Sequence, residues 1–293
     1  MKNPIARGMK FPRLQPGVLA TILLTVAGSL PASAQLPIIN DPPMLGYHTA
    51  YMNKKYQFGM TGNGEISVRL IDSKGQVATS SFIVRITIGI EEILPDGKTV
   101  LRQIKPETLE SAQSPNGNFE KTVISGKVSG DAVFEATMEQ NRGVITMGGR
   151  VTDPGPLVKN PLRFTARMNF PQAYPYDLKG EKQNDKKAVK LFEKKIEGDL
   201  LELKWTDGKK KKLNFAEEVD VSTADINGPG VAEVEIETAA CAGKKYLVTA
   251  SPNSAMKLWS AKPAPLHMGF SLYWSPDPAK DSDGKARMSI DLK

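Results

Sequence analysis

The stretch KTVISGKVSGDAVFEATMEQNRGVITMGGRV, residues 121–151, decides the fold class. It holds three runs rich in residue types that favour strands, and these runs are 121–128, 132–140 and 143–151. Only Ser129-Gly130-Asp131 and Asn141-Arg142 separate the runs, and both connections favour tight turns. Strands joined by tight turns pair antiparallel. The stretch therefore predicts a meander of three antiparallel strands.

Alternation of apolar and polar residues extends this pattern to both sides of the meander. In 65–71, for example, Ile66, Val68 and Leu70 fall on one face of a strand. The other candidate strands are 81–90, 99–104, 162–169, 200–206, 209–215, 231–238, 245–250, 256–260, 268–274 and 286–292. Roughly a dozen strands separated by turn residues predict an all-β protein with an antiparallel β-sandwich-like architecture.

Two local signals add detail to this prediction. Asp207-Gly208 is a strong hairpin signal between two candidate strands. In 184–197 apolar residues recur at a spacing of four between a capping Asn184 and a terminating Gly198, which predicts one short helix.

The chain divides into segments of different character. We expect a signal peptide at 1–34, an extended leader at 35–55, a first β half at 56–170, an aromatic loop with the helix at 171–198, and a second β half at 199–293. The prolines of the leader predict no regular structure there. The pattern leaves open whether 56–293 is one domain or two.

The first segment predicts export. Four basic residues precede the apolar stretch 17–30, and Ala32 and Ala34 match the small-residue pattern of a signal-peptidase site. The apolar stretch is shorter than the roughly 20 residues that a membrane crossing needs. No later segment is apolar enough to cross a membrane as a helix. We therefore expect cleavage near Ala34 and a secreted or periplasmic protein.

Cysteine content and charge refine this expectation. Cys241 is the only cysteine, so the chain has no internal disulfide, and a signal peptide without a disulfide framework favours a bacterial exported protein. A reactive thiol is the alternative reading of Cys241. The net charge is +7, and removing the four basic residues of 1–34 leaves +3, which gives no argument for nucleic-acid binding.

Aromatic residues give the one indication of a ligand. Exposed Trp and Tyr rings stack on sugar rings, whereas buried ones pack in the core. Tyr273 and Trp274 are adjacent in a predicted strand, so their side chains point to opposite sides. The candidate carbohydrate-binding residues are Trp205, Trp259, Trp274, Tyr174 and Tyr176.

The acidic loop 277–284 has two readings. Asp277, Asp281 and Asp283 would supply oxygen ligands for calcium if the loop gathered them around one ion. The loop lacks the first aspartate and the later glutamate of an EF-hand, which favours a solvated hairpin loop. Calcium is the only cofactor that the sequence suggests. The four lysines at 209–212, in turn, fit an exposed edge strand or a surface for an acidic polysaccharide.

Recognised catalytic motifs are missing. The chain has no Gly-x-Ser-x-Gly, no phosphate-binding glycine loop, and only two histidines, His48 and His267. We therefore expect a non-enzymatic binding module or an envelope-associated protein, with a polysaccharide or envelope component as partner. A carbohydrate-active lyase or hydrolase is the alternative, and Asp177, Tyr176 and His267 would be its candidate acid–base residues.

Overall fold

The predicted meander is present. In the computed structural model β8 (Lys121–Lys127), β9 (Val133–Asn141) and β10 (Val144–Asp153) pair antiparallel in sequence. Arg142 and Gly143 have φ values of 49° and 85°, so the second turn closes in the left-handed region that tight hairpins require. The structure describes residues 35–72, 74–77, 83–172, 194, 196–238, 241, 244–277, 279–281 and 283–293.

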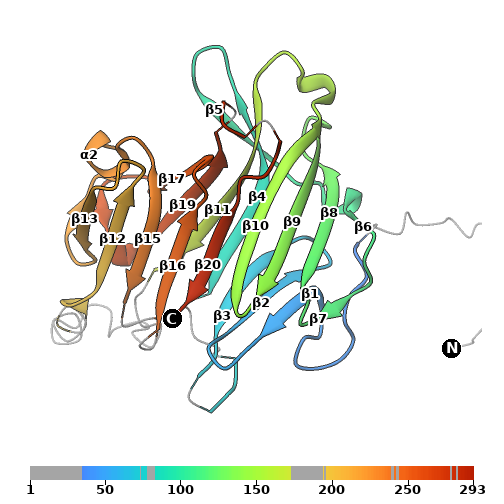
Figure 1. Cartoon of the computed structure of the whole chain (residues 1–293), viewed down its shortest axis with the longest axis horizontal. Coiled ribbons are helices and arrows are strands. Elements are labelled where there is room, and N and C mark those ends of the chain that lie inside the picture. The colour runs from blue at the N-terminus through green and yellow to red at the C-terminus, as the bar shows by residue number, and fades with distance from the viewer. Residues whose placement is uncertain are drawn as a thin grey trace, which may run out of the picture. The chain divides into compact units, whose positions relative to one another are not determined.

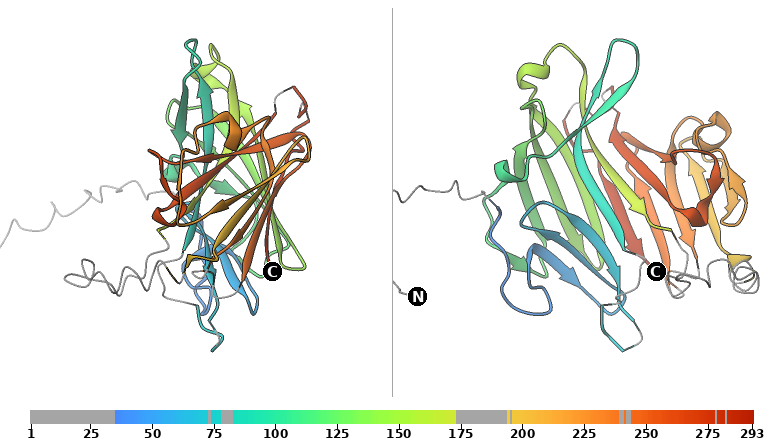
Figure 2. Two further views of the ribbon diagram at one scale, coloured as in Figure 1. Left: turned by 90° about the vertical axis from the view of Figure 1, so that its left-hand side faces the viewer. Right: turned by 180° about the vertical axis from the view of Figure 1, so that it is seen from behind.

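The larger strands form two layers, named layer A and layer B. Layer A runs β1 (Tyr47–Met52), β2 (Tyr56–Thr61), β3 (Ile66–Leu70), β4 (Val84–Ile93), β11 (Leu162–Phe170), β19 (Phe270–Pro276) and β17 (Ser254–Trp259). Layer B runs β6 (Glu110–Ser111), β8, β9, β10, β20 (Met288–Leu292), β16 (Lys245–Ala250), β15 (Val231–Glu237), β12 (Leu200–Trp205) and β13 (Lys210–Asn214). Figure 1 shows β13 to β8 side by side, and Figure 2, from behind, shows β4, β11 and β19.

Pairing within the layers is antiparallel, and a few contacts join the layers or extend them. Val231 of β15 pairs with Met256 of β17, which links layer B to layer A. The parallel pair is β1 with β7 (Asn116–Gly117). The remaining elements are β5 (Thr99–Gln103) beside β4, the pair β14 (Glu218–Val219) and β18 (Ala264–Pro265), α2 (Ala224–Asn227), and the 3-10 turns η1 (Pro106–Thr108), η2 (Gly155–Leu157) and η5 (Leu266–Met268).

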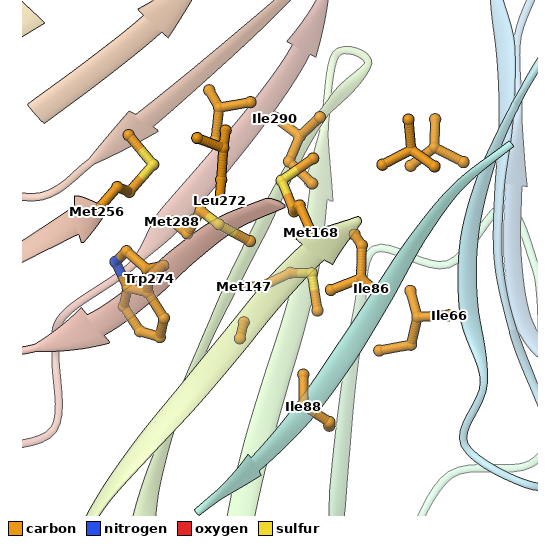
Figure 3. Packing of buried hydrophobic residues seen from close by; sticks show 14 of the residues in the cluster. Ile66, Ile86, Ile88, Met147, Met168, Met256, Leu272, Trp274, Met288 and Ile290 are labelled. Carbon is orange, nitrogen blue, oxygen red and sulfur yellow. The ribbon is translucent and has the colours of Figure 1, made fainter. Parts of the chain in front are cut away.

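The core lies between the two layers. Apolar side chains at alternate positions of most strands in the two layers point inward, as the period of a strand requires. Phe134 of β9 contacts Phe164 of β11 across the layers, with ring centroids 6.2 Å apart, and Phe170 of β11 meets Tyr246 of β16 at 5.7 Å. Figure 3 shows residues of β3, β4, β11, β17 and β19 meeting residues of β10 and β20.

The fold class predicted from the sequence is confirmed: the protein is nearly all β and sandwich-like. The Asp207-Gly208 hairpin is confirmed too, because it joins β12 to β13 with Gly208 at a φ of 86°. Strands from both predicted β halves are interleaved in each layer, and the described residues belong to one compact unit. None of the helices in the described part of the chain has the length and apolarity that a membrane crossing requires.

The leader differs from its prediction. Residues 35–40 have no regular structure and residues 41–46 form turns, but β1 follows them, because the prolines end before Gly46 and Tyr47–Met52 is free to pair with β2. The leader also lies along the domain: Leu36 is buried and its N–H donates to the carbonyl of Gly62 at 3.1 Å. The predicted helix at 184–197 lies almost wholly outside the described residues.

Candidate functional site

Strand β19 separates the core from a candidate site. Leu272 and Trp274 point inward and are buried, whereas Ser271 and Tyr273 lie on the outer side of layer A. The prediction that Tyr273 and Trp274 point to opposite sides is therefore confirmed. What gathers around Tyr273 on the outer side is set by the register of the neighbouring strands.

The register aligns two rows of outward side chains across layer A. The first row is Ser67, Arg85, Asn169, Ser271 and Trp259, each directly opposite the next. The second row is Thr87, Arg167, Tyr273 and Lys257. We call this surface the arginine–aromatic face and define it by Arg69, Arg85, Arg167, Lys257, Tyr273 and Trp259.

One end of this face is aromatic. The guanidinium carbon of Arg167 lies 4.5 Å from the ring centroid of Trp259 and 4.9 Å from that of Tyr273. The two rings meet edge to face, with centroids 6.0 Å apart. Such cation–π contacts contribute roughly 0.5–1 kcal/mol at exposed sites. Trp259 remains 43 % exposed, so Arg167 orders the indole without covering it.

A chain of hydrogen bonds holds Arg167 in place. Its Nε donates to Ser271 Oγ at 3.1 Å, and that hydroxyl donates to Asn169 Oδ1 at 3.0 Å. The amide of Asn169 donates to the carbonyl of Arg85 at 3.4 Å. Ser271 at the centre of this chain is buried, so its hydroxyl holds the direction in which Arg167 points.

The face carries cations without carboxylate partners. Among the described residues Arg69, Arg85, Arg167 and Lys257 form no ion pair. Glu91 is the acidic residue among the described outward side chains of β3, β4, β11, β17 and β19, and Arg163 holds it, with 2.5 Å between Arg163 Nη2 and Glu91 Oε2.

The other end of the face is a hollow of about 860 Å³ over β2, β3 and β4. Its lining includes Tyr47, Gln57, Ser67, Arg69, Arg85 and Thr87. Gly59 of β2 lets the Tyr47 ring pack against the strand at this end, because a Cβ at this position would lie 2.4 Å from that ring. The amide of Gln57 ties the hollow to the leader by donating to the carbonyl of Pro43 at 3.1 Å.

Tyr273 is a neutral hydrogen-bonding group at physiological pH. Burial raises the pKa of its phenol above the usual 10.0, and the nearby Arg167 offsets only part of that rise. The aromatic end therefore offers two aromatic rings, a protonated phenol and a guanidinium, which are the groups that stack on and hydrogen-bond to a saccharide.

The structure separates the predicted tryptophans. Trp259 lies on the exposed face, whereas Trp274 is fully buried and its indole N–H donates to Ser254 Oγ at 3.0 Å, so it is a core residue. Trp205 is half-buried and donates to the carbonyl of Ile226 at 2.7 Å. Tyr174, Tyr176 and Asp177 lie outside the described residues.

The three candidate calcium ligands do not converge. Asp281 accepts hydrogen bonds from Asn253 and from the N–H of Ala286, Asp277 pairs with Lys280, and Asp283 pairs with Lys285. No group of three or more His, Cys, Asp or Glu side chains within the described ranges is placed to hold a metal. Local partners satisfy these carboxylates, as in a solvated loop.

The remaining candidates fall into structural roles. Cys241 is buried, and burial raises the pKa of its thiol from 9.0 to about 12, which makes it unreactive at neutral pH. Of the four lysines at 209–212, the last three lie in β13 and pair with Glu202 or Asp225, and the first directly precedes β13 and pairs with Asp207. They fit an exposed edge strand, because β13 pairs with β12 alone among the described strands. His267 lies in η5, where its N–H donates to the carbonyl of Phe215.

Sequence reasoning missed the arginines. Arg69 and Arg85 occupy outward positions of candidate strands, so alternation marked them as surface residues. Their position on the same face as Trp259 depends on the order β3-β4-β11-β19-β17, which joins segments almost 200 residues apart and leaves no local signal.

Comparisons with known proteins bear on the fold alone. No family model matches the chain, and no curated protein matches it. The α-N-acetylgalactosaminidase of Bifidobacterium bifidum, solved with GalNAc, is similar with a TM-score of 0.51 and 10 % identity over 83 % of this chain. A quadruple mutant of the same enzyme gives 0.48 and 11 %, also over 83 % of this chain. The chain covers only 35 % and 36 % of these two solved chains. At 10 % identity, the first likeness shows a shared β architecture.

Proposed function

We propose that this chain is an exported, non-enzymatic glycan-binding protein whose arginine–aromatic face is the binding surface. The observation that carries the proposal is the exposed Trp259, held beside Tyr273 by Arg167. An exposed aromatic that is fixed before binding loses little side-chain entropy when a ligand stacks on it. That is a property of a binding surface rather than of a solvated one.

The polar groups around Trp259 suit a saccharide. A sugar ring presents C–H groups that stack on an aromatic face and hydroxyls that pair with donors and acceptors. Arg167, Tyr273 and Lys257 supply donors beside the indole. The likeness of the fold to part of a glycan-processing enzyme agrees with this class of ligand.

The arrangement of the acidic residues on the face favours a binding function over a hydrolytic one. Glycosidases use two carboxyl groups about 5–10 Å apart, one of them free to donate a proton. Of the described acidic residues of the face, Glu91 is engaged by Arg163, and Glu65 lines the hollow at the end away from Trp259, so the aromatic end has no described pair of carboxylates. The predicted signal peptide at 1–34 supports export to the place where envelope or extracellular glycans are found.

Calorimetric titration of the purified protein with oligosaccharides tests this proposal. The probes are hexamers of glucose, xylose, N-acetylglucosamine and galacturonate. We expect at least one hexamer to bind, Trp259→Ala to weaken that affinity at least tenfold, and Trp259→Phe to retain most of it. Lys245→Ala, on the outer side of layer B, is the matched control and leaves affinity unchanged. Absence of binding to all four hexamers, or equal affinity of Trp259→Ala and the unmodified protein, overturns the proposal.

A further inference from the structure

The hollow at the β2–β4 end of the arginine–aromatic face is lined by more positive than negative side chains. Its charged lining residues among those described are Arg69, Arg85 and Glu65. Neither arginine forms an ion pair with Glu65 or with any other described carboxylate. The hollow therefore holds two guanidinium groups against one carboxylate.

Arg69 also has an unmet hydrogen-bonding group. Its Nε is buried without a hydrogen-bond partner among the described residues. Gln57 lies directly opposite Arg69 in the register, but its amide nitrogen donates to Pro43 and its carbonyl oxygen accepts from Tyr47 at 3.4 Å. Buried donors are normally paired, so a group that occupies the hollow and accepts a hydrogen bond is the partner that is missing.

The two arginines are close enough to act on one group. Arg85 of β4 lies opposite Ser67 of β3, and Arg69 is two residues beyond Ser67 in β3. Such diagonal positions are about 7–8 Å apart, within joint reach of two long side chains. Guanidinium groups pair with carboxylate and sulfate through two parallel hydrogen bonds.

Layer B shows that this fold can pair its outward cations. Lys121 pairs with Glu139 at 2.8 Å, Lys210 with Glu202 at 2.7 Å, and Lys245 with Glu237 at 2.7 Å. The same cross-strand geometry on layer A places Ser67 and Asn169, both neutral, opposite Arg85. The cations of the hollow are thus complementary to a negative charge that the ligand brings.

We propose that the hollow binds a carboxylate or sulfate of the glycan, so that the ligand is an acidic saccharide. This inference rests on the glycan-binding function proposed above. The first row of the face connects the hollow to Trp259 across four strand spacings, about 19 Å in total. An oligosaccharide that stacks on Trp259 therefore extends along the row and places an acidic sugar between Arg85 and Arg69.

Two matched pairs of probes test this inference by titration calorimetry. One pair is hexagalacturonate and its fully methyl-esterified form, and the other is a heparin hexasaccharide and its desulfated, N-acetylated and carboxyl-reduced form, so that the second member of each pair carries no charge. We expect at least one acidic member to bind at least tenfold more tightly than its neutral partner. Arg85→Gln brings that ratio close to one, because it weakens binding of the acidic member far more than binding of the neutral member, and Arg85→Lys restores part of the ratio. Arg69→Gln has the same effect, and the exposed Arg85 keeps the test valid if the Arg69 variant fails to fold. Lys121→Gln on layer B is the control.

The outcomes separate the two proposals. Equal affinity for the acidic and neutral members of both pairs overturns the acidic ligand, while glycan binding stands if Trp259→Ala still abolishes it. Binding of inorganic sulfate or phosphate as tight as that of the acidic hexamers shows a site for free anions, which also overturns the inference. An acidic preference that depends on Arg85 but not on Trp259 supports the hollow and contradicts the aromatic part of the proposed function.

Discussion

The outer faces of the two layers share the alternation of inward and outward side chains, but they differ in whether their charged side chains form ion pairs. On layer B lysines and glutamates stand opposite or diagonal to one another and pair across strands, as Lys245 does with Glu235 and Glu237. On layer A the arginines Arg85 and Arg167 stand opposite neutral residues and pair with no described carboxylate. Both layers use the same alternation to fill the core. The two outer faces differ in whether their cations already have a carboxylate partner within the protein.

This difference in charge pairing has little effect on the stability of the fold. Exposed ion pairs add little to folding, so the charge ladders of layer B keep the surface soluble without holding the layers together. The unpaired arginines on layer A likewise change the free energy of unfolding little. An anionic or hydroxyl-rich ligand gains from it, because the donors need not be released from internal partners before they bind.

The largest expected effect is the difference in stability loss between two tryptophan substitutions, one on the core side of β19 and one at the exposed end of β17. Trp274→Ala removes a fully buried ring and is expected to lower the free energy of unfolding by about 3–5 kcal/mol. Trp259→Ala removes an exposed ring and its cation–π contact, with an expected loss of about 1 kcal/mol. Denaturant unfolding of both variants checks this. Equal losses for the two tryptophans would show that Trp259 is a structural residue and would remove it from the binding surface.

A smaller effect follows from giving layer A the charge pattern of layer B. Thr87 is exposed directly opposite Arg167, so Thr87→Glu places a carboxylate beside the guanidinium. We expect affinity for the acidic hexamer to fall at least tenfold, about 1.4 kcal/mol. The free energy of unfolding is expected to stay within about 0.5 kcal/mol.

Thr87→Gln serves as the control for this substitution, since it has the same size and no charge. The two affinities are compared by calorimetry at the same salt concentration. A Thr87→Glu variant that binds the acidic hexamer as well as Thr87→Gln does would mean that the cations of layer A are not used by the ligand.

The smallest effect is a local titration on layer B. The hydrogen bond from Lys210 is the main cause that lowers the pKa of the Glu202 carboxyl below its usual 4.5. A lowered folded-state pKa contributes stability above pH 4.5, and this contribution is lost as the pH falls through the lowered value. NMR titration of Glu202 is expected to show a midpoint below 4.5, which moves back toward 4.5 in Lys210→Ala. An unchanged midpoint in that variant would show that the ladder is not formed in solution.

The fold was predictable because its signals are local. Turn residues such as Asp207-Gly208 and the alternation of Ile66, Val68 and Leu70 depend only on neighbours in the chain. Strand β1 was missed because Tyr47–Ala50 is buried at every position, which hides the alternation by which strands are recognised.

The site was predictable only in part, because it depends on pairing between distant segments. Trp259 was among the predicted residues, but nothing in the sequence distinguished it from Trp274, which lies in the neighbouring strand and points inward. Arg85 and Arg167 carried no signal beyond alternation, since strand order is set by the tertiary structure.

The central claim is that ligand binds to layer A and not to layer B. NMR mapping of backbone amide shifts, during titration of the purified protein with the tightest-binding hexamer, tests it most directly. We predict that the shifted amides cluster in β4, β11, β17 and β19, with the largest shifts beside Arg167 and Trp259. Shifts clustered in β9, β12 and β15 instead would contradict this account.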